Sequence, residues 1–118
     1  MPSPRASSPT PERLDRLFAA LADGSRRAMV DQLGRGPASV SDLARPLALR
    51  LPSALKHLAV LEAGGIVQSD KAGRVRTYRI APEAFNGLEA WVAERKAMWH
   101  RQFDALDALL AEQDGTQP

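Results

Sequence analysis

Residues 39–80 contain two helix signals followed by a hairpin signal, and this order constrains the fold more than any other feature of the chain. Ser39, with Asp42 three residues later, marks the start of a short first helix. A second helix begins near Pro52 and ends at a pair of glycines. The β-branched runs around a turn at Gly73 predict a hairpin. Two helices and a hairpin in this order predict a winged helix-turn-helix, whose second helix and hairpin have the shape to enter DNA grooves.

Helical patterns also precede this unit. Thr10 followed by Pro11 is a helix start, because a hydroxyl cap comes before proline at the first helical position. Asp23 ends that helix and caps the next one, which stops at residues 34–37. We therefore expect one domain over residues 11–112, mainly α with a small β-hairpin, between disordered tails at residues 1–10 and 113–118.

A long helical pattern follows the hairpin, from about residue 83 to residue 112. At 1.5 Å per residue it would extend about 45 Å, which is longer than a domain of this size is wide. One protomer cannot cover its apolar side, so a second copy is the simplest cover; two helices folded back within a monomer are the alternative. The helix that starts at Pro11 has an apolar stripe of its own. Together the two stripes form the predicted dimer interface, which comprises Leu14, Leu17, Phe18, Leu21, Trp91, Trp99, Phe103, Leu106 and Leu110.

The net charge of +2 conceals an uneven distribution. Residues 26–79 contain ten basic and four acidic residues, a net charge of +6, whereas the remainder has six basic and ten acidic residues, a net charge of −4. A basic middle between acidic ends is typical of a duplex-binding module; ordinary surface charge is the alternative. The sequence lacks a secretory signal and a run of about 18 apolar residues, so we expect a cytoplasmic protein without a membrane partner.

Helical periodicity identifies the residues expected to contact DNA. With Ala54 and Leu58 of the second helix turned inward, Lys56 is the one long polar donor aimed outward, and it can reach a phosphate or a guanine edge. On the hairpin, strand alternation places Arg74 and Arg76 on one face near the tip, where they suit phosphate contacts. The predicted DNA-binding residues are Arg50, Leu51, Pro52, Ser53, Leu55, Lys56, His57, Lys71, Arg74 and Arg76.

Neither a metal site nor a catalytic site is predicted. The chain has no cysteine, which excludes disulfides and thiolate ligands, and its two histidines, His57 and His100, lie 43 positions apart. Neither a glycine-rich phosphate loop nor a Ser-His-Asp arrangement with supporting context is present. We expect no cofactor and no enzyme activity. Arg27, in the first turn of the helix that Asp23 caps, is interpreted as a structural residue that hydrogen-bonds to carbonyl groups.

Between residues 14 and 80 the chain resembles the ArsR/SmtB bacterial repressors in order and spacing. The resemblance rests on four stretches: LADGSRRAM from Leu21, SVSDLA from Ser39, LPSALKHLAVLEAGGIV from Leu51 and GRVRTYRI from Gly73. It implies a homodimeric winged-helix repressor whose first and last helices form the interface, in the subgroup without metal ligands. The chain departs from the family at the start of the second helix, where Arg50, Leu51, Pro52 and Leu55 replace hydroxyl or polar residues. This suggests greater reliance on methyl contacts, the wing and DNA shape.

The sequence thus predicts a sequence-specific DNA-binding regulator, a homodimeric repressor of its own or a neighbouring operon that binds an imperfect palindrome. One alternative is a regulator gated by an organic effector in a pocket at the dimer interface near Trp91, Met98 and Trp99. Another is a winged-helix protein-interaction module without DNA binding, which the apolar Leu51, Pro52 and Leu55 keep open.

Overall fold

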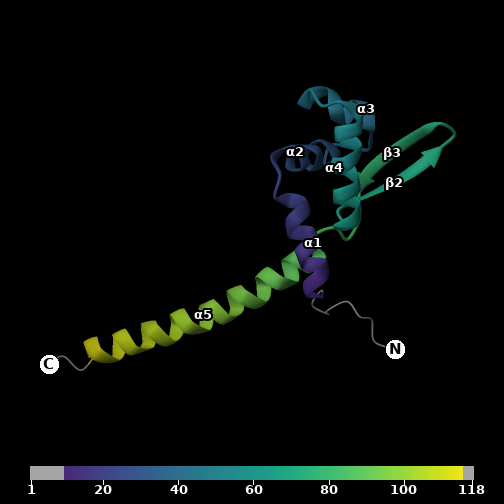
Figure 1. Cartoon of the computed structure of the whole chain (residues 1–118). Helices are drawn as coiled ribbons and strands as arrows, with labels where there is room; N and C mark the ends of the chain where they lie inside the picture. Colours follow the sequence, from purple (N-terminus) through teal and green to yellow (C-terminus); the bar gives the residue numbers. More distant parts are fainter. Residues whose placement is uncertain (1–9, 116–118) are drawn as a thin grey trace, which may run out of the picture.

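The structure is a computed structural model that describes residues 10–115. A small body of helices carries a projecting β-hairpin, and one long helix extends from its base (Figure 1). The elements, in chain order, are α1 (Pro11–Leu21), α2 (Gly24–Leu33), β1 (Ala38–Ser39), α3 (Val40–Ala44), the 3-10 turn η1 (Arg45–Leu47), α4 (Leu51–Ala63), β2 (Val67–Ala72), β3 (Val75–Ile80) and α5 (Asn86–Gly115). The predicted winged helix-turn-helix with a long C-terminal helix is confirmed.

The helices begin where the sequence predicts caps. In each case a cap oxygen accepts a hydrogen bond from the backbone N–H three residues later: Thr10 from Arg13, Asp23 from Arg26 and Ser39 from Asp42. The carboxylate of Asp42 forms an ion pair with Arg45 at 3.5 Å. Pro46 lies in η1, so α3 is as short as its sequence predicts.

The core lies between the helices and the base of the hairpin. Its largest fully buried side chains come from α2, α3, α4 and the start of the hairpin: Met29, Leu43, Leu58, Leu61 and Ile66. Ala54, Leu58 and Leu61 face inward from α4, as their spacing predicts. The opposite side of α4 is therefore left free for an external partner.

The hairpin belongs to a three-stranded antiparallel sheet of order β1-β3-β2. The two-residue strand β1 was not predicted, because Ala38 and Ser39 are too few to show an alternation pattern. Gly73 and Arg74 form the turn between β2 and β3, and Gly73 has a φ of 64°, which favours glycine. The placement of Arg74 on a strand face is therefore wrong, because this residue occupies the turn. At the base of the hairpin, burial raises the pKa of the Tyr78 hydroxyl above its ordinary value.

The long helix α5 begins at Asn86, after a turn that is anchored to the core. The backbone N–H of Ala81 donates to the carbonyl of Ile66 at 2.8 Å, and Ala84 is buried, so the predicted start at residue 83 is a few residues early. The helix continues to Gly115, past its predicted end at residue 112. Thr10, predicted to belong to the N-terminal tail, is the cap of α1. The rest of the predicted tails, residues 1–9 and 116–118, lies outside the described residues. Within residues 10–115, no helix is both long and apolar enough to cross a membrane.

Candidate nucleic-acid interface

The N-terminal half of α4 presents an exposed, mostly apolar surface. Leu51 and Leu55 are 47% and 46% exposed, and Pro52, Ser53 and Lys56 are exposed beside them. Arg50 occupies the N-cap position with an extended backbone, and its side chain makes no capping hydrogen bond. The cationic head of Arg50 and that of Lys56 are thus at the outer surface of the helix that a helix-turn-helix presents to DNA.

Two cations of the hairpin, Arg76 and Arg79, bind polar side chains of the same protomer. Arg79 is neutralised by Asp70, with a distance of 2.9 Å between Nε and Oδ2. Arg76 donates to Ser69 Oγ at 2.9 Å, and that hydroxyl lies 3.3 Å from a carboxylate oxygen of Glu62 at the end of α4. This chain of contacts connects the hairpin β2–β3, which is the wing of the fold, to α4, which is its recognition helix.

Four other cations of the predicted interface are exposed and make neither an ion pair nor a side-chain hydrogen bond with residues 10–113: Arg50, Lys56, Lys71 and Arg74. Two of them belong to the start of α4 and two to the tip of the hairpin. Unpaired cations keep their full charge for an external anion, whereas a cation in an ion pair must first lose its partner. The arrangement is suited to binding a polyanion such as the DNA backbone.

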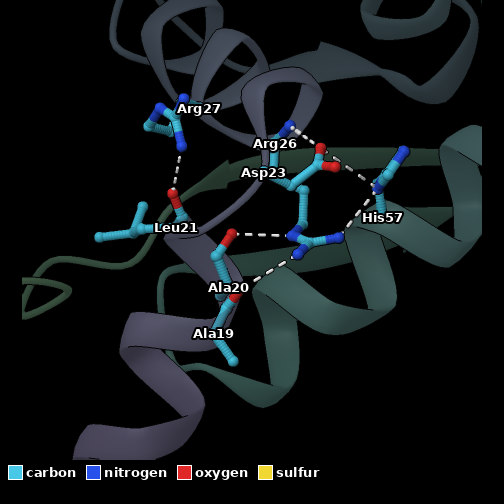
Figure 2. Close-up of polar contacts among 7 residues, drawn as sticks. All are labelled: Ala19, Ala20, Leu21, Asp23, Arg26, Arg27 and His57. Carbon is cyan, nitrogen blue, oxygen red and sulfur yellow. Dashed lines mark hydrogen bonds and ion pairs between the residues drawn. The ribbon is translucent and has the colours of Figure 1, made fainter.

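His57, by contrast, is held inside a junction between α1, α2 and α4 (Figure 2). Its Nδ1 lies 3.1 Å from Nη1 of Arg26 and 3.9 Å from the Asp23 carboxylate. The same guanidinium donates from Nε to the carbonyl of Ala20 at 2.8 Å and from Nη2 to that of Ala19 at 3.0 Å. A single arginine thus connects the C-terminal end of α1 to the recognition helix.

Arg27 and Asp23 complete this junction. Arg27 donates from Nη1 to the carbonyl of Leu21 at 2.7 Å, which confirms its interpretation as a structural residue. Because the terminal carbonyls of a helix have no intrahelical partner, Arg26 and Arg27 act as a side-chain cap on the end of α1. The hydrogen bond from the Arg26 backbone N–H holds the pKa of Asp23 below its ordinary value. The role of Arg26 could not be predicted from the sequence, because its partner His57 is 31 positions away.

The recognition helix also packs tightly on α1. At Gly64, which follows α4, an added Cβ would lie 2.9 Å from the Cβ of Ala20 and 3.0 Å from the carbonyl oxygen of Arg16. Only a residue without a side chain permits this approach. The orientation of α4 is therefore set by α1 at two points, the Gly64 contact and the Arg26–His57 hydrogen bond.

The helix α1 meets α5 through aromatic side chains. The rings of Phe18 and Trp91 pack edge to face with centroids 5.7 Å apart, and the guanidinium of Arg95 lies 4.5 Å from the centroid of the Trp91 ring. A groove of about 450 Å³ opens beside them, and its lining includes Leu14 and Asp15. The two helices predicted to form the dimer interface are thus adjacent.

The predicted interface residues differ in exposure. Leu17 is only 6% exposed and belongs to the core of the protomer, so its assignment to the interface is wrong: the α1 stripe serves the core as well as the surface. Leu14, Leu21 and Trp91 are half-buried, and five others are exposed between 41% and 61%: Phe18, Trp99, Phe103, Leu106 and Leu110.

A metal centre does not emerge in the described part of the chain. Among residues 10–115 there is no group of three or more His, Asp or Glu side chains placed to hold a metal ion. His57 is hydrogen-bonded to Arg26 in the junction between α1, α2 and α4, and His100 lies exposed on α5.

The candidate interface thus consists of exposed cations, the exposed surface of α4 and the wing. These features define a winged helix-turn-helix DNA-binding protein.

Comparison with known proteins agrees with this class. A helix-turn-helix domain family matches residues 21–69. The HTH-type transcriptional regulator Rv2034 of Mycobacterium tuberculosis is 38% identical over 86% of this chain and 94% of its own length. The crystal structure of the ArsR family transcriptional regulator RHA00566 is 47% identical, with a TM-score of 0.74 over 80% of this chain and 97% of that one.

A further similar structure is a homodimeric winged helix-turn-helix DNA-binding domain from Mycobacterium bovis, 29% identical with a TM-score of 0.60 over 78% of this chain and 84% of that one. The chain belongs to the ArsR family of winged helix-turn-helix transcriptional regulators.

Proposed function

We propose that this regulator is a cytoplasmic homodimer that represses transcription by binding an imperfect palindrome near its own gene or a neighbouring operon. The observation that carries the proposal is the set of four exposed cations that pair with no residue between 10 and 113, at the start of α4 and the tip of the wing: Arg50, Lys56, Lys71 and Arg74. The α4 helix supplies the probe for the major groove, and the wing supplies phosphate contacts beside it.

The apolar start of α4 determines how sequence would be read. Leu51 and Leu55 are exposed over almost half of their surface, and no described residue of the protomer covers that exposed area. On a recognition helix such side chains can contact thymine methyl groups, while Lys56 can donate to guanine O6 or N7. We therefore infer readout by methyl contacts and one long donor, with DNA shape contributing near the wing.

The proposal of a homodimer follows from α5. Every described side chain from residue 96 to residue 113 is exposed, including six large apolar ones: Met98, Trp99, Phe103, Leu106, Leu109 and Leu110. An apolar surface of this length on a free helix favours association, and a second copy offers a matching surface. The homodimeric winged-helix domain from Mycobacterium bovis, similar in fold, supports the same assembly.

A second candidate function is control by an organic effector. The groove of about 450 Å³ between α1 and α5 is lined by Phe18, Trp91 and Arg95, which offer an aromatic surface and a cation. A ligand there would act on the helix that positions α4. Titration of tryptophan fluorescence with candidate ligands tests this role, and saturable quenching that accompanies release of DNA would support it.

DNA binding itself is tested by selection. Purified full-length protein is incubated with sheared genomic DNA at moderate salt, and retained fragments are sequenced and footprinted. We expect enrichment of the region upstream of its own gene or a neighbouring operon. Retention of no specific fragment would contradict the proposed function and favour a protein-interaction module.

A further inference from the structure

The two ring nitrogens of His57 have different surroundings. Nδ1 lies 3.1 Å from Nη1 of Arg26, and a guanidinium has N–H donors but no acceptor. Nδ1 must therefore accept this hydrogen bond. A neutral imidazole that accepts at one nitrogen carries its proton on the other, so the geometry defines an uncharged His57 with hydrogen on Nε2.

Asp23 does not compete for this ring nitrogen. Its Oδ2 lies 3.9 Å from Nδ1, beyond hydrogen-bonding distance, and already accepts the backbone N–H of Arg26 at 3.0 Å. A proton on Nδ1 would also face the N–H of the guanidinium. Arg26 rather than Asp23 therefore determines which nitrogen of His57 carries the hydrogen.

The other ring nitrogen is directed away from the junction. Figure 2 shows the Nε2 end of His57 pointing away from both Arg26 and Asp23. The side chain remains 22% exposed, and no residue between 10 and 113 supplies a hydrogen-bond partner for Nε2. His57 follows Lys56 directly and lies one helical turn after Ser53, both of which are exposed on α4.

We propose that His57 donates a hydrogen bond from Nε2 to a phosphate oxygen of duplex DNA, and that Arg26 is the positioning residue that orients its ring. This inference rests on the proposed DNA binding of α4. Uncharged donors to phosphate are common in protein–DNA interfaces, where they fix the register of a recognition helix without reading a base.

Arg26 also connects this donor to the end of α1. Its guanidinium binds the carbonyls of Ala19 and Ala20 at the end of α1 while it holds the His57 ring. The helix α1 contacts α5 through Phe18 and Trp91, next to the proposed dimer interface. The phosphate donor is therefore connected through α1 to α5, the helix of the proposed dimer interface.

Two substitutions at His57 separate the two ring nitrogens. His57→Gln extends an amide group to about the position of Nε2, whereas His57→Asn reaches only to about the position of Nδ1. On a duplex selected by the wild-type protein from genomic DNA, we expect His57→Asn to weaken binding about tenfold per dimer, because each neutral hydrogen bond contributes a few-fold. His57→Gln should retain most of the affinity.

The salt dependence distinguishes an uncharged donor from a cation. Because an uncharged His57 releases no counterion, His57→Asn should lower affinity without changing the slope of log K against log salt. A slope reduced by about 0.9 per protomer would show that His57 binds phosphate as a cation, which would overturn the proposal.

Arg26→Lys tests the positioning role, because lysine keeps the charge but cannot hold three acceptors in one plane. We expect a loss of affinity similar to that of His57→Asn and little further loss in the double variant, since coupled residues are not additive. Arg27→Lys is the matched control: Arg27 binds the carbonyl of Leu21 but not His57, so DNA affinity should be unchanged.

Nitrogen-15 NMR of the full-length wild-type protein provides a readout that does not depend on variant folding. We expect a protonated Nε2 and an unprotonated Nδ1 for His57, a shift of the Nε2 signal when the selected duplex is added, and loss of the tautomer preference in Arg26→Lys. His100, exposed on α5, is the internal reference.

A proton on Nδ1, or wild-type affinity in a folded His57→Asn variant, would overturn the inference while leaving the proposed function intact. If the wild-type protein selects no duplex, the proposed function fails first.

Discussion

Loss of the cation at the tip of the wing should reduce the salt dependence of DNA binding by a calculable amount. Arg74 lies in the two-residue turn of the hairpin, and no residue between 10 and 113 pairs with its guanidinium. Each phosphate contact contributes about 0.9 to the slope of log K against log salt, so Arg74→Ala should lower the slope of a dimer by about 1.8. When the salt concentration rises from about 50 to about 200 mM, the affinity of Arg74→Ala should therefore fall by a factor about tenfold smaller than the affinity of the wild type.

Fluorescence anisotropy of a labelled operator duplex, repeated over that salt range, measures this slope. The control is the double variant Arg79→Gln with Asp70→Asn, which removes an ion pair of the same hairpin without changing its net charge. We expect the control to keep the wild-type slope. An unchanged slope in Arg74→Ala would remove the wing tip from the DNA interface and refute the reasoning from unpaired cations.

Three further changes test the base contact, the helix packing and the dimer. Lys56→Ala should cost about 1–3 kcal/mol on the operator and much less on random DNA in competition binding; equal losses would make Lys56 only a phosphate anchor. Gly64→Ala should destabilise the fold by about 1–3 kcal/mol in urea unfolding, because its Cβ would lie 2.9 Å from that of Ala20; a wild-type midpoint would refute this packing. Trp99→Asp with Phe103→Asp should give monomers in sedimentation, since buried carboxylates are costly; a persistent dimer would exclude this α5 surface.

The parts of the fold that the sequence predicts are those with local signals. Caps such as Thr10 and Ser39 act within one helical turn, and the spacing of Ala54, Leu58 and Leu61 directly reports the buried side of α4. The two-residue strand β1 has no such signal, because it exists only through its pairing with β3.

The parts of the site that the sequence does not predict depend on long-range contacts. The apolar stripe of α1 is visible in the sequence, but only the packing shows that Leu17 points into the core while Phe18 remains exposed. Likewise, the charge of Arg79 could not be distinguished from that of Arg74 until the structure showed Asp70 beside it. The function of a charged side chain is decided by its neighbours, and those of Arg26 come from α1 and α4.

We propose that two protomers, held together through α5, place two copies of α4 on one face of DNA. Hydroxyl-radical footprinting of the wild-type protein on its selected operator tests this directly. We predict two protected half-sites related by an imperfect dyad, with centres about 34 Å, or one helical turn, apart. A footprint confined to a single half-site would contradict it.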